Sequence, residues 1–106
     1  MYKLVRDKVI DIARAEGIII DAAQILNDEF FNWAIREKLY EEIQEYFQSD
    51  DSLEELCDIQ LVINTIVGDR KEEFKALYAK KLEEKGGFDR RIIGFFPDPM
   101  PEIPQE

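Results

Sequence analysis

The chain has 106 residues, of which 24 are acidic and 14 basic, and its formal net charge is −10. This length fits one domain with a modest core, and a hydrophobic content of 45% is typical of a folded chain. The negative charge disfavours the phosphate backbone of nucleic acid, so we expect no nucleic-acid partner. The absence of histidine excludes Ser-His-Asp and Cys-His catalysis and histidine-containing zinc sites.

Two features bear on location. No apolar run approaches the roughly 20 residues that a membrane-spanning helix needs, and no signal-peptide pattern opens the chain. The single cysteine, Cys57, cannot form an internal disulfide, which fits a reducing compartment. We therefore expect a cytoplasmic protein without a membrane partner.

Capping and helix-ending residues divide most of the chain into helices. Asn27 is a good N-cap for a long helix, and Ser52 caps the next one with Glu55 at the capping-box position. Gly68 ends that helix, and Gly86–Gly87 stop the last one. The predicted helices cover residues 7–16, 28–48, 53–67 and 69–85.

Between and after these helices the sequence predicts extended segments. The β-branched run Ile18–Ile20 is expected to be a short extended connector, and Phe88–Phe96 is expected to be a short strand or an ordered arm. Residues 97–106 form a proline-rich tail that is expected to be extended and flexible. Because the connections between the long helices are short, residues 1–96 are predicted to form one all-α domain, an antiparallel helix bundle.

One acidic residue lies where burial is expected. At about 100° per residue, the helix 28–48 has one apolar stripe, and Glu42 falls inside it. Glu45 lies at its edge and Glu41 lies outside. A buried carboxylate is unfavourable unless it is paired or binds a cation, so Glu42 needs an explanation that Glu41 does not. The stripe consists of Phe31, Ile35, Leu39, Ile43 and Tyr46.

The following helix carries two more carboxylates in unusual surroundings. Residues 53–67 are apolar nearly all round, which predicts the most buried element, yet Glu55 and Asp58 share one side of it. A hairpin with a short turn brings that side opposite Glu42 and Glu45. Four facing carboxylates would repel one another, and a hard cation such as Mg²⁺, which takes oxygen ligands, removes the conflict. Acidic pairs on helices are also common as solvated faces, and that alternative stays open.

The last predicted helix carries two lysines at notable positions. Lys81 projects onto the inward face expected for the last helix and Lys85 follows one turn later, so both can meet phosphate; Lys81 can equally cover apolar surface with its stem.

On the first long helix a second aromatic line consists of Trp33, Tyr40 and Phe47. It is a candidate for part of an interface with another subunit, and packing against the N-terminal helix or the C-terminal arm stays open as an alternative.

Three segments together resemble one superfamily. Glu41–Glu45, followed by Glu55–Asp58, resembles the EExxE…ExxD signature of the all-α nucleoside triphosphate pyrophosphatases, which include MazG-like enzymes, dimeric dUTPases and phosphoribosyl-ATP pyrophosphohydrolases. The opening Tyr2–Lys8 is similar to the KLVRDK start of a MazG-like, phosphoribosyl-ATP-pyrophosphohydrolase-like branch. Lys80–Phe88 resembles the KKxEERGGF ending of that branch's last helix.

The resemblance implies a reaction and a set of site residues. It implies Mg²⁺-dependent hydrolysis of an NTP or dNTP to the monophosphate and pyrophosphate, with Mn²⁺ as a possible substitute metal. It also implies a homodimer or homotetramer. The implied metal ligands and catalytic residues are Glu42, Glu45, Glu55 and Asp58, and the implied phosphate-binding residues are Lys81, Lys85, Arg6 and Lys8. Two alternatives stay open: a phosphoribosyl-ATP pyrophosphohydrolase of histidine biosynthesis, and a non-catalytic helical oligomerisation or regulatory module.

Overall fold

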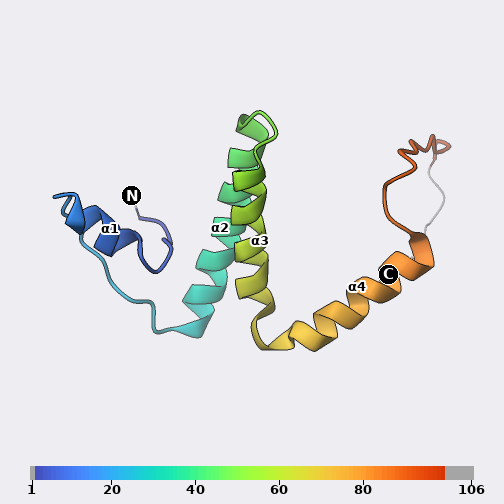
Figure 1. Cartoon of the computed structure of the whole chain (residues 1–106). Coiled ribbons are helices and arrows are strands. Elements are labelled where there is room, and N and C mark those ends of the chain that lie inside the picture. Colours follow the sequence, from blue (N-terminus) through green and yellow to red (C-terminus); the bar gives the residue numbers. More distant parts are fainter. Residues whose placement is uncertain (1, 100–106) are drawn as a thin grey trace. The chain divides into compact units, whose positions relative to one another are not determined.

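The computed structural model describes residues 2–99, and these form four α-helices and one short 3-10 helix but no β-strand (Figure 1). The predicted all-α class is confirmed. The chain divides into two compact units, Met1–Lys71 and Glu72–Glu106. None of the described helices is long and apolar enough to cross a membrane. The helices are α1 (Val9–Ala15), α2 (Asp28–Gln48), α3 (Leu53–Val67) and α4 (Lys71–Lys85), with the 3-10 helix η1 (Gly68–Arg70) before α4.

One of the segments that were predicted to be extended differs from the prediction. Ile18–Ile20 is irregular backbone, as a connector requires, but the strand considered for Phe88–Phe96 does not form. This segment begins with a turn in which the Arg91 amide donates to the Phe88 carbonyl, 3.0 Å away, and it continues as irregular backbone. No described segment offers a strand to pair with, and an isolated strand leaves its backbone groups unpaired. Of the proline-rich tail, residues 100–106 lie outside the described residues.

The ends of α2 and α3 lie where the sequence predicts them, because capping side chains satisfy their backbone amides. Helix α1 is shorter than the predicted 7–16 and has no capping side chain at Lys8, and α4 begins at Lys71 rather than at residue 69 because Gly68–Arg70 form the 3-10 helix. Asn27 Oδ1 accepts the Phe30 amide at 2.8 Å, and Ser52 Oγ accepts the Glu55 amide at 3.4 Å. Gly68 follows α3 with a φ of 55°, a conformation that glycine adopts without a steric penalty. These local interactions define α2 and α3 without help from distant residues.

The α2–α3 hairpin is the centre of the first unit, and its two helices run antiparallel and side by side (Figure 1). A short turn joins them and is held by its own side chains. Ser49 Oγ donates to the Tyr46 carbonyl at 2.6 Å, and Tyr46 Oη donates to Asp51 Oδ1 at 2.8 Å. That hydrogen bond is also the main reason that the pKa of Tyr46 is raised. The turn thereby sets which faces of α2 and α3 meet.

The core between these helices is small and follows the predicted stripe of α2. Ile35 is buried beside Ala34, and the other stripe residues are half-buried. The prediction that α3 is the most buried element is wrong: Val62 is its one buried residue. Within the unit α2 covers one side of α3, so apolar side chains on its other sides are exposed, among them Leu53, Leu56 and Leu61.

Candidate metal centre

Three carboxylates from the two helices of the hairpin meet at one point. Glu42 comes from α2, and Glu55 and Asp58 come from successive turns of α3. One oxygen from each lies within 4.8 Å of the other two. Ligand oxygens on opposite sides of one Mg²⁺ or Ca²⁺ ion are about 4–5 Å apart, so this spacing is close to that of a single ion. These three residues are called the inner triad below.

The inner triad contains buried oxygens that lack the partner a buried charge requires. Glu42 is 6% exposed and is the one buried charged residue among residues 2–99. In that part of the chain, neither Oε2 of Glu42 nor Oε2 of Glu55 has a hydrogen-bond partner, although both atoms are buried. A buried carboxylate oxygen without a partner is costly. A cation held by the inner triad would supply positive charge to both carboxylates, and three carboxylates are oxygen donors, so the donor set fits Mg²⁺ or Mn²⁺.

Lys38 compensates the other oxygen of Glu42. Its ammonium lies 3.1 Å from Glu42 Oε1 and 3.3 Å from Glu41 Oε1, and its side chain is 14% exposed. Burial by itself lowers the pKa of Lys38, but the hydrogen bond to Glu42 and the charges of both glutamates outweigh it and raise the pKa. Lys38 therefore stays charged and compensates Oε1 of Glu42, whereas Oε2 has no hydrogen-bond partner among the described residues.

A second group of carboxylates lies along α2 and shares Glu42. Oxygens of Glu41, Glu42 and Glu45 also lie within 4.8 Å of one another. Partial burial alone would raise the pKa of Glu41, but hydrogen bonds and charges from Lys3 and Lys38 outweigh it and lower the pKa. Glu41 is thus already paired with two ammonium groups.

Glu45 shows the opposite behaviour. A hydrogen bond to Glu42 raises the pKa of Glu45, and burial and the charges of Glu42, Glu55 and Glu41 raise it further. This is the signature of carboxylates that repel one another when all are ionised. The structure thus brings all four predicted metal ligands into one cluster, with Glu42 common to both of its groups. An added cation would relieve the repulsion that Glu45 experiences.

The turn between α2 and α3 explains why the Glu55 carboxylate does not cap α3 and can belong to the cluster. A complete capping box at Ser52 would need the Glu55 side chain to accept the Ser52 amide. Instead, that amide donates to Ser49 Oγ at 3.3 Å. Only half of the predicted capping box forms, through the Glu55 amide and Ser52 Oγ. Because Ser49 takes the remaining donor, the Glu55 carboxylate is not needed at the helix end.

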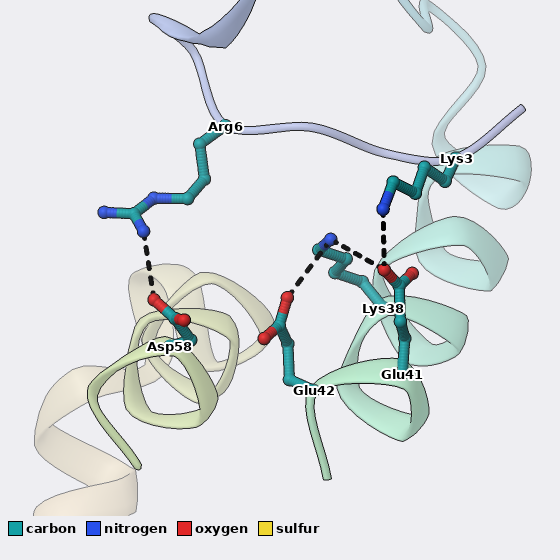
Figure 2. Close-up of polar contacts among 6 residues, drawn as sticks. All are labelled: Lys3, Arg6, Lys38, Glu41, Glu42 and Asp58. Carbon is teal, nitrogen blue, oxygen red and sulfur yellow. Dashed lines mark hydrogen bonds and ion pairs between the residues drawn. The ribbon is translucent and has the colours of Figure 1, made fainter. Parts of the chain in front are cut away.

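Two cations reach the cluster from the amino-terminal segment, residues 2–8, which is called the strap below. Figure 2 shows Lys3 and Arg6 extending from the strap toward the hairpin. Lys3 Nζ lies 3.2 Å from Glu41 Oε1, and Arg6 Nη1 lies 3.0 Å from Asp58 Oδ1. Within the first unit the cluster has two more carboxylates than cations, counting Lys3, Arg6 and Lys38 against the five acidic residues.

The predicted phosphate-binding residues have different positions. Arg6 is at the cluster, whereas Lys8 is an exposed residue at the start of α1. Lys81 and Lys85 lie on α4 in the second unit, and all of α4 is exposed. Lys38 is not among the predicted site residues, although its spacing of four residues from Glu42 on one helix was a usable signal. Lys3 gave no local signal, because its partner is 38 residues away.

The chain was also compared with known proteins. No family model matches it, and neither the curated proteins nor the solved structures contain a match.

Proposed function

We propose that this protein is a Mg²⁺-dependent nucleotide pyrophosphohydrolase of the all-α NTP pyrophosphatase type, which cleaves an NTP or dNTP to the monophosphate and pyrophosphate. The observation that carries the proposal is the buried Glu42 carboxylate, which has an unpartnered Oε2 among the described residues and forms the inner triad with Glu55 and Asp58. The resemblance of the EExxE…ExxD segments to that superfamily supplies the reaction.

The side chains have distinct roles in this proposal. Glu42, Glu55 and Asp58 hold the metal, and Glu45 completes the ligand set. A bound Mg²⁺ or Mn²⁺ ion would balance the charge of the polyphosphate and lower the pKa of a water molecule at the site. Arg6 lies at the cluster, and its guanidinium would bind a phosphate group. The parallel N–H donors of a guanidinium match the oxygens of a phosphate. Lys81, Lys85 and Lys8 are further proposed contacts to phosphate.

The acidic cluster argues against a non-catalytic module, because carboxylates that repel one another destabilise the folded state. A scaffold gains no stability from like charges gathered at a half-buried place, and replacing them with apolar residues would often stabilise it. The phosphoribosyl-ATP pyrophosphohydrolase alternative uses the same chemistry, so it becomes one arm of the substrate test. We place either enzyme in the cytoplasm.

The test is an assay for pyrophosphate release with the eight common NTPs and dNTPs and with phosphoribosyl-ATP, with and without Mg²⁺. We expect turnover that requires Mg²⁺ and stops when EDTA is added. Glu55→Gln should abolish it. Glu54→Gln is the matched control. Glu54 is the neighbouring exposed residue of α3, so this substitution removes the same charge outside the cluster. No turnover on any substrate, together with no heat of Mg²⁺ binding, would support the module instead.

We also propose that the protein is a homodimer or homotetramer. The aromatic line of α2 supports this, because Trp33, Tyr40 and Phe47 are 50%, 62% and 78% exposed. Phe30 extends the line by stacking on Trp33, with ring centroids 5.7 Å apart. Large exposed apolar patches of this kind mark interaction surfaces.

A further inference from the structure

The strap contacts the α2–α3 hairpin at three places. The Tyr2 ring meets the Phe30 ring edge-on, with centroids 6.5 Å apart. Lys3 pairs with Glu41 on α2, and Arg6 pairs with Asp58 on α3. Figure 2 shows the last two contacts on either side of Glu42. The strap therefore holds two cations against the acidic cluster.

These two cations have different partners. Lys3 binds Glu41, which also pairs with Lys38 and is not part of the inner triad. Arg6 binds Asp58, which is a member of the inner triad. A divalent cation held by the inner triad would therefore lie within a few ångströms of the Arg6 guanidinium and would compete with it for Asp58.

Lys38 also touches the inner triad, but its surroundings are unlike those of Arg6. Lys38 is largely buried and has two carboxylate partners on its own helix. The Arg6 side chain is 66% exposed and has one carboxylate partner, 52 residues away in the sequence. Exposed ion pairs contribute little to stability. Arg6 is therefore the more weakly held of these two cations.

We infer that Arg6 is a displaceable counter-ion of the metal centre. It holds Asp58 while the inner triad has no metal, and a divalent cation releases it. The freed guanidinium then binds a phosphate group of the nucleotide. The contacts of Tyr2 and Lys3 keep the rest of the strap on the hairpin, so Arg6 stays beside the site after release. This inference rests on the proposed function, because it requires that the inner triad binds a divalent cation.

The first test measures Mg²⁺ binding by calorimetry, without nucleotide, in the full-length protein. Arg6→Gln should tighten Mg²⁺ binding about two- to fivefold, the range expected when an exposed ion pair no longer competes. Lys3→Gln is the matched control, because it removes the same charge from the strap but keeps the ion pair between Arg6 and Asp58. Equal tightening in both variants would overturn the inference, since it would reflect net charge alone.

The second test observes the Arg6 guanidinium directly by nitrogen-15 NMR, with its signal assigned by its loss in Arg6→Gln. Rotation of the guanidinium should be hindered without metal and in Lys3→Gln, and free in Asp58→Asn. Saturating Mg²⁺ should free it, and a non-hydrolysable α,β-methylene triphosphate should hinder it again. A guanidinium that stays hindered while Mg²⁺ binds overturns this inference alone. No Mg²⁺ binding in wild type or either variant overturns the proposed function, and this inference with it.

Discussion

Lys38 and Glu42 lie one turn apart on α2, and the Lys38 ammonium is 3.1 Å from Oε1 of Glu42. This pair explains how a carboxylate can be the one buried charged group among residues 2–99. The ammonium compensates Oε1, and Oε2 has no hydrogen-bond partner in that part of the chain. The same ammonium also binds Glu41, so one lysine separates two adjacent glutamates into different roles.

Glu42→Gln should weaken Mg²⁺ binding by at least about tenfold and abolish Mg²⁺-dependent turnover, because an amide is a poorer ligand than a carboxylate for a hard cation. Glu41→Gln should change Mg²⁺ affinity by less than that, since Lys3 and Lys38 already pair with Glu41. Calorimetry and pyrophosphate release measure both variants. If Glu41→Gln proved the more harmful change, the roles assigned to the two glutamates would be reversed.

Lys38→Met should destabilise the metal-free protein by about 1–3 kcal/mol, because it leaves the buried Glu42 without its counter-charge. Saturating Mg²⁺ should restore part of the loss, since the metal supplies positive charge to the same carboxylate. Urea unfolding with and without Mg²⁺ gives both values. Lys38→Arg, which keeps the charge, should lose less stability than Lys38→Met; an equal loss would point to packing as the cause.

The metal-free protein should lose stability as the pH rises above about 4.5, through the raised pKa of Glu45. A group whose pKa is raised on folding stabilises the fold fully below its unfolded pKa, and this contribution disappears as it ionises. Glu41, with a lowered pKa, acts in the opposite sense and contributes stability that is lost as the pH falls below 4.5. Urea unfolding of Glu45→Gln against wild type isolates the Glu45 contribution, which should be absent in the variant. Saturating Mg²⁺ should also remove it from wild type.

Ser49→Ala should cost about 1 kcal/mol of stability and also weaken Mg²⁺ binding. The change frees the Ser52 amide, which can then attract the Glu55 carboxylate to the helix end and away from the inner triad. Asn27→Ala is the matched control, because it removes a helix cap of similar value outside the cluster. Thermal unfolding and Mg²⁺ calorimetry separate the two effects. Unchanged Mg²⁺ affinity in Ser49→Ala would show that Ser49 does not influence the Glu55 carboxylate.

Tyr40→Glu should shift the assembly toward monomers, because it places a charge in the middle of the exposed aromatic line of α2. Light scattering across a range of protein concentrations measures the change. Asp28→Asn, which changes an exposed residue in the first turn of α2 on another side of the helix, serves as a control that should leave the assembly intact. A wild-type protein that is monomeric at high concentration would refute the assembly and the role of this line.

The placement of helices could be predicted because their signals are local. Asn27, Ser52 and Gly68 act on backbone groups within one turn, so their effect does not depend on the rest of the fold. The burial of Glu42 was predictable for the same reason, since helical periodicity relates it directly to the apolar stripe of α2. The degree of burial of α3 was not predictable from its composition, because burial depends on how many neighbours cover a helix.

The sequence by itself thus determined the helices, the face on which Glu42 lies and the identity of the acidic residues, all of which follow from spacing along one chain segment. Only the tertiary structure decided which carboxylates meet and which cations balance them. The turn at Ser49 sets the register of α2 against α3 and so brings Glu55 and Asp58 to Glu42. The contact of Arg6 with Asp58 joins residues 52 positions apart, and no local pattern encodes a partner at that distance.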